Sequence, residues 1–265
     1  MAWRDDEKTT LVAYLRELHL PTMRSCFEEQ ARGAEQETLS YERYLLELAE
    51  RECQVRRQNR IERLLRQSRL PLEKDLARFD LKRLPTRVAR QVRTRLDGSF
   101  VDRKENVLVF GNPGSGKTHL LCAVAQERVR SGRKVYFRSC SLMVQELLVA
   151  KRDLTLSRLI KRLAGYDALI LDDLGYVQQS REEMEVLFTL LAERYERGTV
   201  MLTLRAPALV ALSLPFSKWE AIFKDPMTTA AAIDRLVHHR VILELNIPSY
   251  RMEQAKKAKA GSNVA

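Results

Sequence analysis

G-N-P-G-S-G-K-T occupies Gly111–Thr118. It follows a short apolar run with β-branched residues, Asn106–Phe110, and precedes a stretch, His119–Arg130, in which apolar residues recur at helical spacing. A strand, a glycine-rich loop and a helix in this order form the context of a phosphate-binding loop. A chance match in a solvent-exposed turn would lack these flanking patterns, so we predict a site for a phosphorylated ligand here.

Each residue type in this loop has a physical task. Glycines allow a positive φ, so that backbone N–H groups turn inward and, together with the helix N-terminus, surround phosphate oxygens. We expect Lys117 to reach the β- and γ-phosphates and Thr118 to offer its hydroxyl to Mg²⁺. The expected cofactors are ATP and Mg²⁺. The residues expected to hold the nucleotide are Gly111, Asn112, Pro113, Gly114, Ser115, Gly116, Lys117, Thr118 and His119.

A second acidic motif lies about 55 residues after Lys117, in the stretch Y-D-A-L-I-L-D-D-L-G-Y at Tyr166–Tyr176. Two carboxylates at the end of an apolar strand are the Walker-B arrangement. We expect Asp172 to hold Mg²⁺ through water and Asp173 to polarise the attacking water. Adjacent residues of a regular strand point to opposite faces, which lets the two acids divide these tasks. Asp–Asp pairs also occur in turns and helix caps. Here the place of the pair, at the end of an apolar strand and about 55 residues after Lys117, favours the catalytic interpretation.

Composition bounds the class of protein. The chain has 265 residues, enough for one or two domains. No stretch approaches the roughly 20 apolar residues of a membrane helix, and the polar start Met1–Lys8 is unlike a signal peptide. The four cysteines form no C-x-x-C pair, which favours reduced thiols over disulfides or zinc. We therefore expect a cytoplasmic protein without membrane contact.

The net charge of +11 and the isoelectric point of about 9.7 predict a polyanionic partner. Basic residues concentrate between Arg51 and Arg95, where acids are few. Arginines at three- and four-residue spacing suit a phosphate backbone, although a merely soluble basic surface is the alternative. The residues expected on double-stranded DNA are Arg56, Arg57, Arg60 and Arg63. A second helical face is expected to carry Arg83, Arg87 and Arg90.

The pattern divides the chain into four parts. Residues 1–69 predict a small all-α N-terminal DNA-binding domain with helices over Lys8–Leu18, Pro21–Arg32 and Tyr41–Gln67. The third helix is expected to bury a stripe made of Leu45, Leu46, Leu48 and Ala49. Residues 70–98 are expected to form a basic linker and helix, 99–251 an ATP-binding domain, and 252–265 a disordered tail.

Strand and helix patterns alternate in the third part, which predicts an α/β fold with a parallel sheet flanked by helices. Ligands of such sheets bind at the carboxyl ends of the strands, where the glycine loop lies. The expected strands cover 106–110, 134–137, 167–171, 199–204 and 241–245. The expected helices cover 119–130, 141–151, 155–163, 181–196 and 228–237.

Two further residues have alternative roles. Phe79 either packs on the ATP-binding domain or contacts the nucleotide base. Arg235 either pairs with an acid such as Asp234 or reaches a neighbouring subunit's γ-phosphate as an arginine finger. The spacing alone favours packing for Phe79 and an ion pair for Arg235.

Taken together, these motifs resemble the IstB helper ATPases of bacterial insertion sequences, within the AAA+ superfamily and close to DnaC-type helicase loaders. Besides the loop and the Asp–Asp strand, the resemblance rests on L-P-F-S-K-W (Leu214–Trp219), D-R-L-V-H-H (Asp234–His239) and S-Y-R (Ser249–Arg251). The front part, with E-L-H-L-P-T-M-R at Glu17–Arg24, is also similar to that family's N-terminal domain. The resemblance covers nearly the whole chain.

The resemblance implies an ATP-dependent DNA-binding protein that forms a homo-oligomer on DNA and presents the target to a partner transposase. It implies ATP hydrolysis at subunit interfaces, with Arg235 as the arginine finger. It also implies that Phe79 lies near the nucleotide base.

The fourth strand departs from the family pattern. The family has T-S-N directly before L-P-F-S-x-W, and its Asn orients the attacking water; here Thr203 is followed by Leu204–Ser213. Losing one such group slows a reaction about 10²-fold or more.

Three functions stay open: an ATPase, an ATP-bound DNA scaffold with little turnover, and a helicase loader. A P-loop kinase is disfavoured because no acceptor-substrate motif is present.

Overall fold

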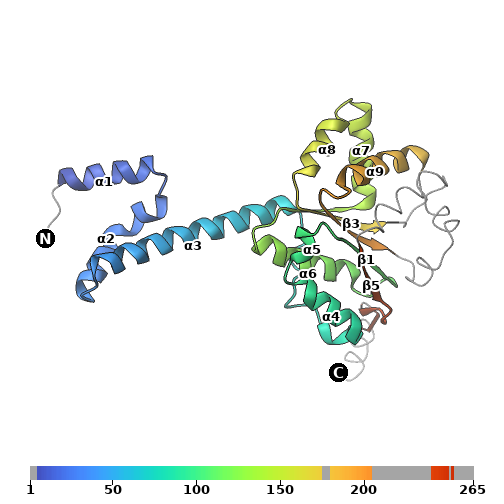
Figure 1. The fold of residues 1–265 in the computed structure, drawn as a ribbon, viewed down its shortest axis with the longest axis horizontal. Coiled ribbons are helices and arrows are strands. Elements are labelled where there is room, and N and C mark those ends of the chain that lie inside the picture. Colours follow the sequence, from blue (N-terminus) through green and yellow to red (C-terminus); the bar gives the residue numbers. More distant parts are fainter. Residues whose placement is uncertain (1–4, 175–179, 205–239, 251, 254–265) are drawn as a thin grey trace, which may run out of the picture. The chain divides into compact units, whose positions relative to one another are not determined.

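A computed structural model of the chain describes residues 5–174, 180–204, 240–250 and 252–253 (Figure 1). Contacts within the chain divide it into two compact units, Met1–Arg63 and Leu64–Ala265. The stretch 70–98, which we expected as a linker and helix, belongs to the second of these units. None of the described helices is both long and apolar enough to span a bilayer.

The first unit is helical. Helix α1 covers Asp5–Glu17, α2 covers Pro21–Gln36, and α3 covers Tyr41–Ser68 and continues into the second unit. Pro21 begins α2, where its fixed φ suits a first helical position. The small core contains Leu15, Cys26, Phe27 and Leu48.

The apolar stripe that we expected on α3 is only partly buried. Leu48 is buried and Ala49 half-buried, but Leu45 and Leu46 are 60% and 47% exposed. The expectation was wrong for these two leucines because the core of the first unit is small and reaches only the face of α3 that carries Leu48 and Tyr44.

Glu52 of α3 is a buried carboxylate that ties two helices of the first unit together. It accepts hydrogen bonds from the backbone N–H groups of Thr22 (2.8 Å) and Met23 (3.0 Å) in the first turn of α2. The Arg56 guanidinium donates to it as well, over 2.6 Å. A carboxylate on otherwise unsatisfied first-turn N–H groups stabilises the start of a helix.

The second unit contains a parallel sheet in which described strands follow the order β2-β3-β4-β1-β5. The bounds are Asn106–Gly111 for β1, Val135–Ser139 for β2, Ala168–Leu174 for β3, Thr199–Leu204 for β4 and Arg240–Leu245 for β5. The predicted α/β fold with a parallel sheet is confirmed.

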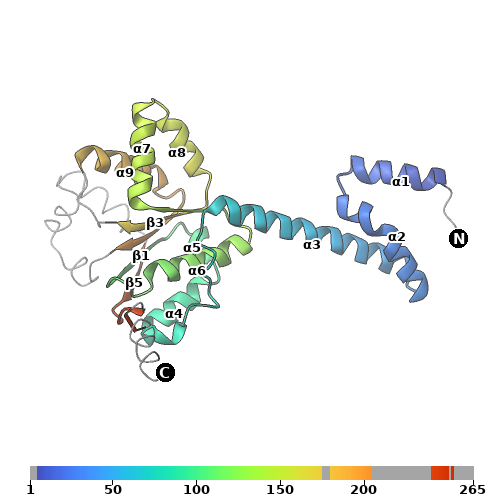
Figure 2. The ribbon, with the colours of Figure 1, turned by 180° about the vertical axis from the view of Figure 1, so that it is seen from behind.

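Helices cover both faces of this sheet, with α7, α8 and α9 on one face and α4, α5 and α6 on the other (Figures 1 and 2). Alternate residues of β1 supply the two cores: Leu108 and Phe110 face the first group, and Val107 and Val109 face the second. The helix bounds are Thr86–Arg95 (α4), Ser99–Asp102 (α5), Lys117–Arg130 (α6), Cys140–Arg152 (α7), Leu156–Ala164 (α8) and Arg181–Arg194 (α9).

Arg83 does not continue the helical face of Arg87 and Arg90, because α4 begins only at Thr86 and Arg83 belongs to a separate 3₁₀ turn, Leu81–Arg83. The helix expected over 228–237 and residues 254–265 of the expected tail lie outside the described residues.

Candidate functional site

The glycine loop connects β1 to α6 and forms a cradle of backbone. Gly114 and Gly116 have φ of 78° and 91°, in the left-handed region that favours glycine. A Cβ atom at Gly114 would lie 2.1 Å from the Ser249 hydroxyl oxygen, and one at Gly116 would lie 3.3 Å from the Phe79 ring. A side chain at Gly114 would therefore collide with Ser249, and one at Gly116 would press against the Phe79 ring.

Lys117 begins α6, and its ammonium group is held by the loop itself. Its Nζ donates to the backbone carbonyls of Gly111 (2.9 Å) and Asn112 (3.1 Å). The Ser115 hydroxyl oxygen is buried without a hydrogen-bond partner among the described residues. The loop thus combines a placed cation with the positive end of a helix, which is the charge pattern of an anion site.

Thr118, on α6 after β1, meets Asp172 on β3, although β1 and β3 are not neighbours in the sheet because β4 lies between them. The Thr118 hydroxyl donates to the Asp172 carboxylate, with O···O distances of 2.8 Å and 3.0 Å to its two oxygens. Asp172 is buried, with 9% of its surface exposed. The structure thereby brings together the two residues predicted to bind Mg²⁺.

β3 is irregular where the two aspartates lie. Leu171 pairs with Leu202 and Leu174 with Leu204, so Asp172 and Asp173 together oppose the single residue Thr203. Asp173 has a φ of 59°, is exposed and lines the cavity. The expectation of regular strand alternation was wrong here, because a bulge rather than the strand pleat separates the two side chains.

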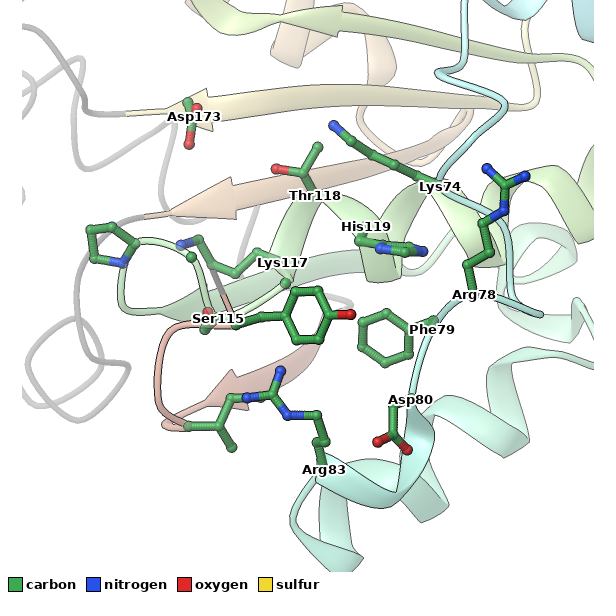
Figure 3. Close-up of a pocket in the computed structure, with 15 residues that line it drawn as sticks. Lys74, Arg78, Phe79, Asp80, Arg83, Ser115, Lys117, Thr118, His119 and Asp173 are labelled. Carbon is green, nitrogen blue, oxygen red and sulfur yellow. The ribbon is translucent and has the colours of Figure 1, made fainter. Parts of the chain in front are cut away.

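A cavity of about 500 Å³ opens over the loop (Figure 3). Lys117, Thr118 and Asp173 surround one end of it, and Phe79, Asp80 and Arg83 lie at the other. Among the predicted residues, Pro113, Gly114, Ser115, Gly116 and His119 also line it. The lining residues that the sequence did not single out for this site are Lys74, Arg78, Asp80, Arg83 and Ile247.

Phe79 is half-buried, packs on the core of the second unit and also lines the cavity. Its ring lies edge-on to the His119 ring, with centroids 5.2 Å apart. His119 in turn contacts the Asp75 carbonyl through Nε2 at 2.9 Å. The Gln126 amide donates to carbonyls of the same segment, so α6 holds residues 71–80 against the mouth of the cavity.

The segment after β5 closes another side of the cavity. The Tyr250 N–H donates to the Gly114 carbonyl over 3.0 Å. The Arg83 guanidinium lies 4.9 Å from the centre of the Tyr250 ring and forms a 2.7 Å ion pair with Glu253. Segments far apart in the sequence therefore build one concave site.

The remaining predicted residues lie elsewhere. Arg56, Arg57, Arg60 and Arg63 are exposed on α3 within the first unit. Arg56 is engaged there, since it pairs with Glu52 and donates to the His19 carbonyl. Arg235 lies outside the described residues, so its role stays a prediction.

The donor set fits a nucleotide with a magnesium ion. Thr118 and Asp172 offer hard oxygen ligands, as Mg²⁺ requires. No group of three or more His, Cys, Asp or Glu that could hold a metal occurs among the described residues. A metal held by one or two carboxylates together with substrate phosphates is the usual arrangement for Mg²⁺ in phosphoryl-transfer sites.

This parallel sheet, with its glycine loop and its acidic strand end, defines a P-loop nucleotide-binding fold. Comparison with solved structures agrees. The DnaC helicase loader superposes with a TM-score of 0.51 at 19% identity, over 61% of this chain and 89% of that one. AMPPCP-bound DnaA from Aquifex aeolicus gives 0.55 at 17% identity, over 72% of this chain and 55% of that one. At these identities the likeness shows the fold alone.

The chain belongs to the family of IstB-like ATP binding proteins, whose model matches residues 13–258. An insertion sequence ATP-binding protein of Sinorhizobium fredii is 39% identical, over 96% of this chain and 83% of the relative. The IS21 ATP-binding protein of Pseudomonas aeruginosa is 34% identical, over 95% and 91%. The resemblance inferred from the motifs is thus confirmed.

Proposed function

We propose that this protein is an ATPase that helps an insertion sequence to transpose, by binding target DNA as a homo-oligomer and recruiting or activating a partner transposase. The observation that carries the ATPase part is the meeting of Thr118 and Asp172 beside the glycine loop, with Asp173 on the cavity wall. The transposition part rests on the family and on the names of its relatives.

The residues divide the reaction between them. Lys117 and the loop N–H groups bind the β- and γ-phosphates, and Thr118 and Asp172 hold the metal. When bound, Mg²⁺ neutralises charge that develops on the transferred phosphoryl group. Asp173, on the cavity wall, orients and polarises the attacking water. Arg235 of a neighbouring subunit completes the site.

The enzymatic step is tested by steady-state phosphate release with DNA present. Asp173→Asn keeps the shape of the side chain and removes its charge, so we expect ATP binding to persist and turnover to fall at least about 10²-fold. Lys151→Gln removes one charge of an exposed ion pair outside the site and serves as the control. An Asp173→Asn protein with unchanged phosphate release and unchanged DNA affinity would refute the enzyme hypothesis.

The arginine finger is tested by mixing. Arg235→Ala and Asp173→Asn proteins are each expected to be inactive alone. If Arg235 acts across a subunit interface, mixed oligomers contain some intact sites, and part of the ATPase activity returns. No recovery in oligomers shown to be mixed would place Arg235 outside the neighbouring site.

A second candidate is an ATP-bound DNA scaffold with little turnover. The absence of the T-S-N asparagine after Thr203 favours it. Tight ATP and DNA binding, together with phosphate release no faster in the wild type than in Asp173→Asn, would support this candidate.

A helicase loader of the DnaC kind shares the fold. Pull-down with a transposase and with a replicative helicase shows which of these two proteins is the partner.

A further inference from the structure

Thr203 is a fully buried polar residue in an otherwise apolar half of β4. Its hydroxyl donates to Asp172 Oδ1 over 2.6 Å and accepts from the Asp173 backbone N–H over 2.7 Å. A threonine hydroxyl has a single donor and can also accept, so one group contacts both residues of the Asp–Asp pair with complementary roles.

The position of Thr203 explains how one hydroxyl can contact both aspartates. Asp172 and Asp173 are the two residues of the β3 bulge, and Thr203 is the one residue of β4 that opposes them. A bulge leaves part of the backbone ladder unpaired. Within this bulge, the Thr203 hydroxyl accepts a hydrogen bond from the Asp173 N–H.

These contacts also restrain the Asp172 carboxylate and the backbone at Asp173. Asp172 is held from α6 by Thr118 and from β4 by Thr203. The φ of 59° at Asp173 is uncommon for a residue other than glycine and persists only where the surroundings hold it. The hydrogen bond to its N–H is such a restraint, and it keeps the side chain on the cavity wall.

We propose that Thr203 is a positioning residue that orients both acids of the ATPase site, Asp172 toward the metal and Asp173 toward the attacking water. This inference rests on the proposed ATPase function. The role proposed for Thr203 does not depend on the asparagine of the family's T-S-N motif, which does not follow Thr203 in this sequence.

The test compares three variants. Thr203→Val keeps the branched shape and removes the hydroxyl, whereas Thr203→Ser keeps the hydroxyl. Thr199→Val is the matched control, because Thr199 is also fully buried on β4 and its hydroxyl has no hydrogen-bond partner among the described residues. Circular dichroism checks that each protein folds, and Thr203→Cys, a weak hydrogen-bond donor, replaces Thr203→Val if that protein does not fold.

For Thr203→Val we expect kcat to fall about 10- to 100-fold, the size usual for residues that orient metal ligands. The affinity for ATP without Mg²⁺ should stay within about twofold, and the Mg²⁺ concentration for half-maximal ATP binding should rise, because only the acids are disturbed. In the nucleotide-free protein the Asp173 amide should exchange faster with D₂O. Thr203→Ser should restore most of each property, and Thr199→Val should match the wild type.

Two outcomes overturn the proposal. One is a Thr203→Val protein whose Mg²⁺ dependence and Asp173 amide exchange match those of Thr199→Val. The other is an equal defect in Thr203→Ser and Thr203→Val, which would assign the effect to packing. Amide exchange and Mg²⁺-dependent ATP binding need no turnover, so they test Thr203 even if the wild type proves to be a scaffold that hydrolyses nothing.

Discussion

Gly114 shows how one missing side chain shapes the site. Its carbonyl accepts from the Tyr250 N–H, and its left-handed φ leaves no room for a Cβ atom beside Ser249. The residue therefore serves two purposes, since its positive φ curves the loop and the lack of a side chain lets the segment after β5 approach the cavity.

We expect Gly114→Ala to weaken ATP binding at least about tenfold, because the new Cβ forces both the loop and Ser249 to move. Isothermal titration of the folded variant with ATP measures the effect. Gly33→Ala is the control: nothing lies within 4 Å of a Cβ there, and alanine in a helix is about 0.5–1 kcal/mol more stable than glycine. Equal ATP affinity in both variants would contradict the proposed role of the loop.

At the scale of elements, the start of α2 depends on a carboxylate from α3. Burial raises the pKa of Glu52, but the hydrogen bonds from Arg56, Met23 and Thr22 outweigh burial, and the pKa lies below its ordinary value of 4.5. A lowered pKa means that the folded state favours the ionised form. The resulting stability is present above pH 4.5 and is lost as the pH falls through the lowered pKa.

We therefore expect Glu52→Gln to destabilise the first unit by about 1–3 kcal/mol at neutral pH. The variant should also lose less stability than the wild type between neutral pH and pH 3. Hydrogen exchange of the α2 amides measures both effects locally. Glu47→Gln, which removes an exposed carboxylate paired with Arg43, is the control. A wild type and a Glu52→Gln protein with parallel pH profiles would show that this carboxylate is not the linked group.

A buried arginine organises the end of the sheet opposite the glycine loop, where strands β3 and β4 begin. Arg194, at the end of α9, is 1% exposed and donates to carbonyls at the end of α8 and at the starts of β3 and β4. Burial lowers its pKa to about 10, so it stays charged at neutral pH. A Cβ at Gly198 would lie 2.0 Å from the guanidinium, which is why the following turn carries glycine.

Arg194→Lys should lower the free energy of unfolding by at least about 2 kcal/mol, because an ammonium group cannot reach carbonyls in so many directions. Urea unfolding followed by circular dichroism measures this change. Arg197→Lys, at an exposed ion pair three residues later, should change stability by less than about 0.5 kcal/mol. Equal midpoints for the two variants would mean that the arginine hydrogen bonds contribute nothing net.

At the scale of the whole molecule, the basic charge is expected to bind DNA through α3. Arg56 is a poor probe of that interface because it pairs with Glu52, and reversing its charge would disturb the first unit. Arg57 and Arg63 are exposed on the same helix and offer a cleaner test.

The double change Arg57→Glu with Arg63→Glu should weaken binding to all DNA sequences alike and reduce the salt dependence of the affinity by a slope of about 2 or more. Fluorescence anisotropy over a series of salt concentrations measures both. Arg152→Glu, on α7 of the second unit, is the control. Unchanged affinity and slope in the double variant would remove this part of α3 from the DNA interface.

The sequence predicted most of the second unit, because its strands are apolar runs and its helices have regular spacing. β3 runs to Leu174, beyond the predicted end, since Leu174 pairs with Leu204 across the bulge. That bulge and the role of Thr203 depend on pairing between strands about 30 residues apart, which local pattern does not reveal. The only local signal was a threonine within the apolar run Val200–Leu204.

The candidate site was predicted at the loop and at the acidic strand, where residue type and spacing specify chemistry. Its outer wall was missed. Lys74 and Arg83 reach the cavity because Gln126 anchors the segment 71–80 on α6 and Glu253 pairs with Arg83. Such contacts join segments separated by 50 to 170 positions, so only the folded chain reveals them.

The central claim is that a triphosphate with its magnesium lies between Lys117 and the Asp172–Asp173 strand end. Isothermal titration of the folded protein with Mg·ATP tests it most directly, with Lys117→Ala and Lys151→Gln as the paired variants. We expect saturable binding in the wild type and in Lys151→Gln, and an affinity at least about 10²-fold lower in Lys117→Ala. Absence of binding heat with the wild type over a range of temperatures, or an unchanged affinity in Lys117→Ala, would contradict the claim.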